Sequence, residues 1–412
     1  MSMLKHITVI LPIAYRGGSL RVTKTIARMI KMGSARDGAS CGVRIAVLAE
    51  KYDVEREFRD VLSEGIEVRE FSWKRTDGRE VEFINKLEDR SPELLHSRYY
   101  LPEDGIHNLM DTDFWLVVSD RTDLPLAPVK PYAVFATDYI QRYVPEIFPP
   151  NGLGKIDAPF IQTVRGANAI IVTTPQTMQD AISYAGVPAA KVHLAPMDFD
   201  PTAVSTYSAD DAGYSSHFVW PTNPTQHKNH KRAYDALERY YTRMGGRLKV
   251  KVVGPNTHWL DPEQTIPKHI AEIQYIADLR EQYRESSALR ENVEFCGELP
   301  DEEYSKIVSA AQFLWHPVLY DNGTFAVAEA ALMGCPSLSS GYPQMRYIGE
   351  RFGIPMKYFD ARSVPSMVEA LKAMEGEAQE LRRSLPDAET LSRHSWERHA
   401  ADYWRMVQGF AA

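Results

Sequence analysis

The residues best suited to chemistry lie in one stretch that begins at His316, where a strand is expected to end. Asp321 follows as a loop carboxylate, and a helix opens around Gly323. The free amides of residues 323–325 at such a helix start are donors for a phosphate. Glu329 lies further along, among apolar neighbours, where a carboxylate is costly unless it is paired. It is either a ligand for ribose hydroxyls or an ordinary helix carboxylate.

Each half of the chain has one further candidate loop, which follows the first strand of that half. Lys228 lies in the loop 221–232 and is a compact cation with three donors, which suits a diphosphate. In the first half, Gly17 and Gly18 allow close approach of the backbone, and the helix behind them favours an anion. The alternatives are an exposed charge at a helix start and a plain tight turn.

Two aspartate motifs have different positions relative to the strands. Asp138 follows the strand 132–136, where it either accepts hydrogen bonds from sugar hydroxyls or caps the next turn. Asp-x-Asp motifs bind manganese and a nucleotide diphosphate in one large class of sugar transferases, but there they follow a strand. Residues 111–113 (Asp-Thr-Asp) precede the strand 114–119, so we interpret them as a solvated loop. The histidines form no metal-binding pattern, and we predict no metal.

Strands alternate with helices in both halves, which predicts parallel sheets covered on both faces. In the first half we expect strands at 7–13, 43–49, 114–119, 132–136, 169–173 and 192–195, and helices at 20–32, 54–63, 160–167 and 175–185. In the second half we expect strands at 217–220, 248–253, 293–295, 313–316 and 337–339, and helices at 229–244 and 324–333. Residues 205–216 have the composition of a linker. Ligands of such sheets lie beyond the carboxyl ends of the strands.

Composition excludes several classes of protein. The 412 residues are 44% apolar and 25% charged, as in soluble globular proteins, and the net charge of −8 disfavours nucleic-acid binding. No apolar run approaches the ~20 residues of a membrane span, and the N-terminus is a better first strand than a signal peptide. Three scattered cysteines fit a reducing cytoplasm.

The first helix is basic although the chain is acidic. Residues 1–36 hold seven basic residues and no acidic one, and four of them share a helix face: Arg21, Lys24, Arg28 and Lys31. This face is a peripheral contact for anionic lipid at the inner side of the plasma membrane, a contact for a polyanionic acceptor, or a solvated surface.

Taken together, these motifs resemble the family-four retaining glycosyltransferases of the GT-B fold. Asp321 and Glu329 take the two acidic positions of that family's Glu-x7-Glu motif, and residues 329–336 (Glu-Ala-Ala-Leu-Met-Gly-Cys-Pro) match its helix ending. Residues 292–299 are similar to the family's stretch beside the base, residues 249–254 match its central strand, and residues 227–229 resemble its diphosphate loop. Residues 395–397 resemble the start of its returning helix.

The resemblance implies two Rossmann-like domains that face each other across a deep cleft. Residues 1–204 with the returning helix 395–412 would bind the acceptor, and residues 217–394 the nucleotide sugar. Asp321, Lys228 and Asp138 would be catalytic. The nucleotide-sugar contacts would be Gly17, Gly18, Gly254, Gly297, Asn322, Gly323, Thr324, Phe325 and Glu329.

Several positions depart from the family pattern. The first acidic residue is Asp321 rather than Glu, and a glycine of the motif is Thr324. Thr222 and Asn223 stand where an arginine is common, an acidic residue is replaced by Gln344, and the histidine of the N-terminal cleft loop by Thr137. These departures concern the donor sugar and the diphosphate contacts.

The implied reaction is the transfer of a hexose or deoxyhexose, with retention, to a saccharide of a cell-surface polysaccharide such as O-antigen or capsule. The nucleotide sugar is a substrate, the departing phosphate takes the acceptor's proton, and neither metal nor cofactor takes part. A donor like GDP-mannose is weakly favoured by the His-Lys-Asn loop. A nucleotide-sugar epimerase or hydrolase of the same fold and a degenerate nucleotide-binding protein are the alternatives. A phosphorylase would need a lysine for its cofactor, and we find no such context.

Overall fold

The computed structural model describes residues 4–119, 121–148, 153–195, 200–201, 204, 215–322 and 325–410. The chain divides into two compact units: Met1–Asp198 together with Trp396–Ala412, and Phe199–Ser395. The predicted domains, residues 1–204 with 395–412 and residues 217–394, have boundaries close to those of these two units. Of the predicted linker, residues 205–214 lie outside the described residues.

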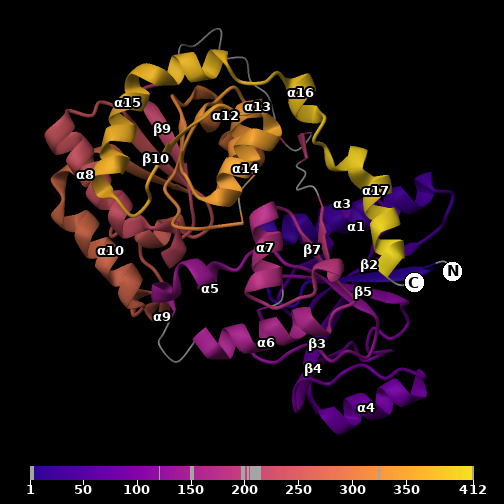
Figure 1. Ribbon diagram of the computed structural model, residues 1–412. Coiled ribbons are helices and arrows are strands. Elements are labelled where there is room, and N and C mark those ends of the chain that lie inside the picture. The colour runs from indigo at the N-terminus through magenta and orange to yellow at the C-terminus, as the bar shows by residue number, and fades with distance from the viewer. Residues whose placement is uncertain are drawn as a thin grey trace. The chain divides into compact units, whose positions relative to one another are not determined.

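The N-terminal unit is built on an eight-stranded sheet in the order β4-β3-β2-β1-β5-β6-β7-β8 (Figure 1). All neighbours are parallel except β3 and β4. The strands are β1 (His6–Ile10), β2 (Gly42–Leu48), β3 (Glu67–Asp77), β4 (Arg98–Glu103), β5 (Phe114–Val118), β6 (Tyr132–Phe135), β7 (Ala169–Val172) and β8 (Val192–Leu194). Every residue of β5, β6 and β7 is buried, as expected of strands covered on both faces.

Helices cover both faces of this sheet. They are α1 (Gly18–Arg36), α2 (Val54–Glu57), α3 (Arg59–Ser63), α4 (Gly78–Leu87), α5 (Ile140–Tyr143), α6 (Leu153–Gly166), α7 (Pro175–Ser183) and α17 (Trp396–Phe410). The last of these packs against α1 although most of the chain separates them. A methyl group at Gly33 would lie 2.1 Å from the carbonyl oxygen of Ala400 and 2.6 Å from Cβ of Trp404, so only glycine permits this crossing.

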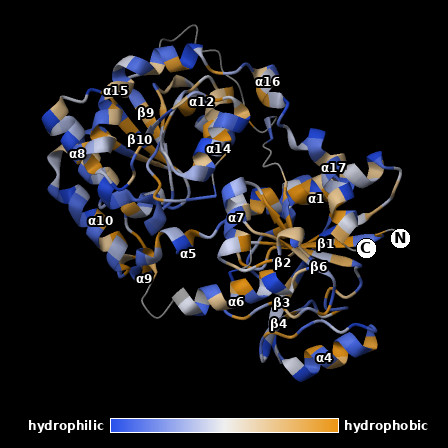
Figure 2. Cartoon of the chain, viewed as in Figure 1, coloured by the Kyte–Doolittle hydropathy of each residue, from blue (hydrophilic) through white to orange (hydrophobic). Residues whose placement is uncertain are grey.

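The C-terminal unit holds a six-stranded parallel sheet in the order β11-β10-β9-β12-β13-β14. Its strands are β9 (His217–Pro221), β10 (Lys249–Val253), β11 (Val293–Gly297), β12 (Leu314–His316), β13 (Ser337–Ser340) and β14 (Met356–Phe359). Its helices are α8 (His230–Met244), α9 (Lys268–Ala271), α10 (Gln274–Glu285), α11 (Ser287–Asn292), α12 (Asp301–Ala310), α13 (Ala326–Leu332), α14 (Pro343–Phe352), α15 (Val364–Arg383) and α16 (Ala388–Ser392). The strands are mostly apolar and the outer helix faces hydrophilic (Figure 2).

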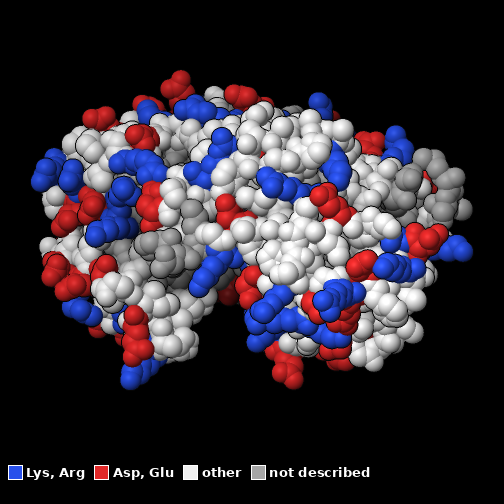
Figure 3. Space-filling view, turned by 60° about the horizontal axis from the view of Figure 1, so that its bottom comes forward, with Lys and Arg blue, Asp and Glu red and all other residues white. Residues whose placement is uncertain are grey.

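The predicted alternation of strands and helices is confirmed, but several elements differ. The strands β3, β4 and β14 were not predicted, and neither were the helices α4, α9, α10, α11, α12, α14, α15 and α16. The helix expected at 54–63 is broken at Phe58 into α2 and α3. Helix α13 begins at Ala326 rather than at Thr324. In the described ranges, no helix combines the length and apolarity needed to cross a membrane. Basic and acidic side chains lie intermixed on the face drawn in Figure 3.

Candidate functional site

In the C-terminal unit, the loops that follow β9 and β12 meet at the carboxyl edge of the sheet. β9 lies between β10 and β12 in the sheet. The chain runs outward from β9 through β10 and β11 and then returns to place β12 on the other side of β9, so the strand order reverses at this point. The amide of Leu319 donates to the carbonyl of His227 (2.9 Å), and Asn229 Nδ2 donates to the carbonyl of Pro317 (3.0 Å). These bonds fix the loop that carries Lys228 against the loop that carries Asp321.

Lys228 and Asp321 form an ion pair with 2.5 Å between Nζ and Oδ2. The other carboxylate oxygen accepts the amide of Asn322 at 2.8 Å. Burial would raise the pKa of Asp321, but the positive charge of Lys228 outweighs burial and holds that pKa below its usual range. Both side chains stay partly exposed, at 15% for Lys228 and 21% for Asp321. The pair is therefore a charged site that solvent can reach.

The other residues predicted for the phosphate and ribose lie after this pair. Asn322 is buried, and Phe325 precedes the first residue of α13. Glu329 is partly buried in the first turn of α13, earlier in the helix than the sequence predicts. Gly323 and Thr324, predicted to bind phosphate, lie outside the described residues.

Two glycines predicted to bind the nucleotide sugar, Gly254 and Gly297, lie at the ends of β10 and β11. Gly254 has φ of +131°, and a methyl group there would lie 2.1 Å from the carbonyl oxygen of Thr222. Its amide donates to the carbonyl of Gly297 (2.8 Å). Gly297 has φ of +73°, and a methyl group there would meet no atom within 4 Å. Gly254 therefore serves the packing of neighbouring loops, whereas Gly297 leaves open space above β11.

A buried polar cluster behind the ion pair was not predicted. His316 ends β12, and its Nδ1 lies 3.2 Å from Ser339 Oγ. Burial, with Lys228 nearby, lowers the pKa of His316 to about 3, so its imidazole is neutral. Tyr342 and Gln344, at the start of α14, lie in the same cluster, and Gln344 Nε2 donates to Tyr320 Oη. In the sequence, Gln344 stood out only as a departure from the family pattern.

In the N-terminal unit, Asp138 is held by Arg121. Arg121 Nη2 donates to Asp138 Oδ1 at 2.9 Å, and its Nη1 donates to Gln141 at 2.7 Å. The same carboxylate oxygen accepts the amide of Ile140, the first residue of α5, at 3.0 Å, although the N-cap residue of this helix is Tyr139. Thr137 lies 3.1 Å from Ser119 Oγ, and Ser119 has the strained φ of +52°. These groups share the carboxyl edge of the first sheet.

Gly17 and Gly18 were predicted in the loop before a helix at 20–32, and the observed helix α1 begins two residues earlier, at Gly18. Gly17 has φ of +65°, and α1 begins at Gly18 without a capping side chain or an acidic residue in its first turn. Beside them, Arg16 Nε donates to Glu57 at 3.0 Å, and its guanidinium lies 5.0 Å from the ring of Tyr52. Both glycines are exposed, as the prediction requires.

The basic face of α1 differs from the prediction of an open cationic surface. Lys24 bonds Asp60 (2.7 Å), and Arg28 bonds Glu64 (2.6 Å) as well as Asp60. Lys31 donates to the carbonyl of Gly65 at 2.6 Å. Three of the four aligned cations are therefore engaged by α3 and the residues after it.

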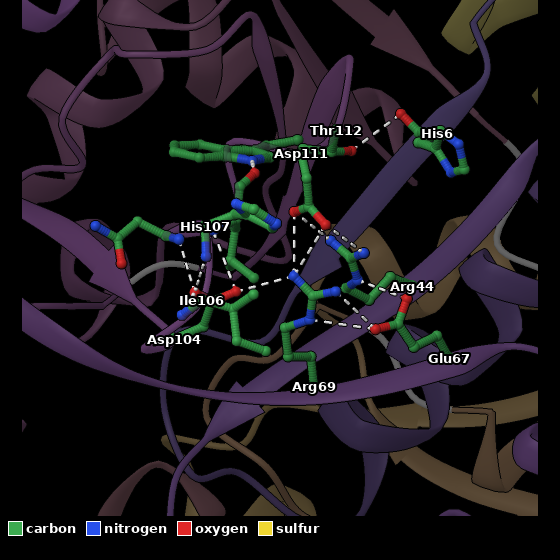
Figure 4. Close-up of polar contacts among 12 residues, drawn as sticks. His6, Arg44, Glu67, Arg69, Asp104, Ile106, His107, Asp111 and Thr112 are labelled. Atoms are coloured by element: carbon green, nitrogen blue, oxygen red, sulfur yellow. Dashed lines mark hydrogen bonds and ion pairs between the residues drawn. The ribbon is translucent and has the colours of Figure 1, made fainter.

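The Asp111–Thr112–Asp113 segment lies before β5, at the sheet edge that the sequence predicts, but it is not a solvated loop. Asp111 bonds both Arg44 and Arg69, and the buried carboxylate of Asp104 accepts a bond from Arg69 at 2.9 Å (Figure 4). Asp113 accepts the amides of Lys5 and His6 at 2.7 and 2.8 Å. Asp104 and Asp111 are thus used by structural ion pairs, and Asp113 by hydrogen bonds to backbone amides. Among the described residues, no group of three or more metal-ligating side chains comes together.

Comparison with known proteins identifies the fold. No family model and no curated protein matches the sequence. Solved structures do match: HepE (Alr3699) of Anabaena, in complex with UDP and glucose, has a TM-score of 0.65 and 14% identity over 98% of this chain and 99% of its own. Sucrose-phosphate synthase of Thermosynechococcus elongatus matches with a TM-score of 0.65 and 13% identity over 98% of each chain. The chain has the GT-B fold. WaaG, a glycosyltransferase involved in lipopolysaccharide biosynthesis, matches with a TM-score of 0.59 and 14% identity over 97% of this chain and 95% of its own.

Proposed function

We propose that this protein is a retaining glycosyltransferase that moves a hexose or deoxyhexose from a nucleotide-diphosphate sugar to a saccharide. The observation that carries the proposal is the Lys228–Asp321 pair, which lies at the strand-order reversal of the C-terminal sheet. Ligands of open parallel sheets bind at this position. The shared fold with HepE, crystallised with UDP and glucose, supports the same chemistry here.

The proposed roles follow from charge. A diphosphate leaving group needs positive charge where negative charge develops, and the ammonium of Lys228 provides it without a metal. Asp321 positions the donor hexose through its carboxylate, and Glu329 holds the ribose. The departing phosphate oxygen takes the proton of the acceptor hydroxyl, so the enzyme needs no strong general acid.

The acceptor belongs to the N-terminal unit, where Asp138 and Thr137 lie at the carboxyl edge of the sheet. We propose a growing saccharide of a cell-surface polysaccharide such as O-antigen or capsule, which the likeness to WaaG supports. A mannose-like donor on guanosine diphosphate is the first donor to test. The proposal does not depend on membrane contact through α1, since most of its aligned cations are paired within the unit.

The test is a panel of uridine-, guanosine-, thymidine- and adenosine-linked sugars without added metal. We expect one nucleotide to raise the melting temperature and its diphosphate to be released slowly. Lys228→Ala and Glu329→Ala should each weaken binding of that nucleotide, whereas Lys306→Ala, which removes an exposed lysine of α12, should not.

The same assay separates the alternatives. Rapid consumption of the donor without any acceptor indicates an epimerase or hydrolase. Binding without turnover, with a panel of saccharide acceptors present, indicates a degenerate binding protein. Unchanged affinity in both variants contradicts the assignment of the site.

A further inference from the structure

Helix α14 starts beside the ion pair without a cap. Tyr342 is its N-cap residue, makes no side-chain capping bond and is followed by Pro343. The first turn contains no acidic residue. Because β13 and β12 are neighbours, this helix start adjoins the loop that carries Asp321. The first amides of α14 thus present donors at the carboxyl edge of the sheet.

Two buried polar atoms lie at this helix start with no hydrogen-bond partner in the described part of the chain. They are Tyr342 Oη and Gln344 Oε1. The side chain of Tyr342 is 7% exposed and that of Gln344 is fully buried. An unsatisfied buried polar atom destabilises a protein, so each such atom needs an explanation.

The two groups lie close to the ion pair. The ring of Tyr342 is 5.7 Å from that of Tyr320, the residue before Asp321, and 6.3 Å from that of His316. Burial raises the pKa of Tyr342, and the negative charge of Asp321 raises it further, so the phenol keeps its proton and remains a donor. The nearby side chains of Lys228 and Asp321 stay partly exposed to solvent.

The chemistry of the unpartnered atoms selects a class of ligand. Gln344 Oε1 and the carboxylate of Asp321 are acceptors, and an anion would meet both unfavourably. A hydroxyl group donates to one of them and accepts from the phenol of Tyr342. We propose that Tyr342 and Gln344 form a subsite that recognises a hydroxyl of the donor hexose and so help to select the sugar. This inference rests on the proposed function and deepens it.

The test uses Tyr342→Phe, which keeps the ring and removes one oxygen. We expect the free variant to melt at a higher temperature, because an unsatisfied hydroxyl is gone. We also expect it to bind the nucleotide sugar about five- to tenfold more weakly while its affinity for the nucleoside diphosphate is unchanged. Tyr347→Phe makes the same chemical change on α14 and should alter neither affinity.

Donor analogues that lack one hexose hydroxyl at a time locate the contact. The analogue without the recognised hydroxyl should bind wild type more weakly, yet bind Tyr342→Phe as well as the full donor does. Equal affinity of wild type and Tyr342→Phe for the full donor overturns the subsite, and so does an equal loss for sugar and diphosphate. If wild type binds none of the nucleotide sugars, the proposed function fails as well.

Discussion

At the scale of single residues, Lys228 has two competing partners. In the free protein it bonds Asp321, and in the proposed reaction it bonds the diphosphate. The site is thus preorganised by a carboxylate that the incoming phosphates must displace from the ammonium group. Asp321, with one methylene less than Glu, reaches Lys228 without leaving its bond to the amide of Asn322.

Asp321→Asn should separate these two roles. Loss of the negative charge frees Lys228, so the nucleoside diphosphate should bind about two- to tenfold more tightly, as expected when a charge-assisted bond worth ~1 kcal/mol no longer competes. Transfer should fall by at least about tenfold, because the hexose loses its ligand. Calorimetric titration and a transfer assay measure the two effects. Asp321→Glu is the matched control and should retain most transfer; weaker diphosphate binding in the Asn variant would count against the competition.

Two buried histidines should make the stability of the fold depend on pH. Burial lowers the pKa of both His230 and His316 to about 3, against about 6.5 in the unfolded chain. Below pH 6.5 these two histidines are therefore protonated in the unfolded state but not in the folded state. The free energy of unfolding decreases as the pH falls from 6.5 toward 3. Each residue contributes up to about 1.4 kcal/mol per pH unit within this window.

Urea unfolding of the full chain between pH 7.5 and 5 checks this expectation. His316→Asn should flatten the dependence on pH although it lowers stability at pH 7.5. His269→Gln, a change at an exposed position, should leave the dependence as in wild type. A steep dependence that survives in both His316→Asn and His230→Asn would contradict the assignment.

At the scale of elements, charge pairing defines the role of α1. Arg28→Glu would place a third negative charge beside Asp60 and Glu64. These partners are 43% and 42% exposed, so screening by solvent limits the loss to about 1 kcal/mol of unfolding free energy. Chemical unfolding measures this loss, and the exchanged pair Arg28→Glu with Glu64→Arg should recover part of it. A membrane contact would instead be favoured if the wild type binds anionic liposomes and the Arg28→Glu variant does not, while the stability of the two proteins is the same.

The elements also show which features the sequence predicts. Strands such as β5 and β7 are continuous apolar runs because both of their faces are buried, so composition alone identifies them. In β3 only Phe71 and Thr76 are buried and several charged side chains form ion pairs, and α4 follows it directly, so neither element has the pattern of a buried α/β element. Short β14 is only partly buried.

The same reasoning applies to the site. Lys228 and Asp321 were each predicted from their position after a strand, but their contact depends on β9 and β12 being neighbours, which no local pattern encodes. The sequence does not mark Tyr342 and Gln344 as candidate site residues, because the feature that singles them out is two buried atoms without partners, which only a packed structure shows. The engagement of Lys24 and Arg28 by α3 likewise required tertiary contacts.

At the scale of the whole molecule, the first unit is completed by residues that follow the second. The crossing of α1 and α17 leaves no room for a side chain at Gly33. Gly33→Ala should therefore lower the unfolding free energy by about 1–3 kcal/mol, since overpacking forces the helices apart. Gly409→Ala on α17 meets no atom within 4 Å and should be neutral or slightly stabilising. Thermal unfolding of the two variants measures the difference.

The crossing of α1 and α17 also sets an order of events during synthesis. The strip of α1 around Ile30 and Gly33 is covered by Ala400 and Trp404, which leave the ribosome only after the entire second unit has been translated. At roughly 5–20 residues per second, this strip stays uncovered for tens of seconds. The nascent chain thus displays an apolar surface for most of its synthesis, and the unit translated first is the last to reach its native state.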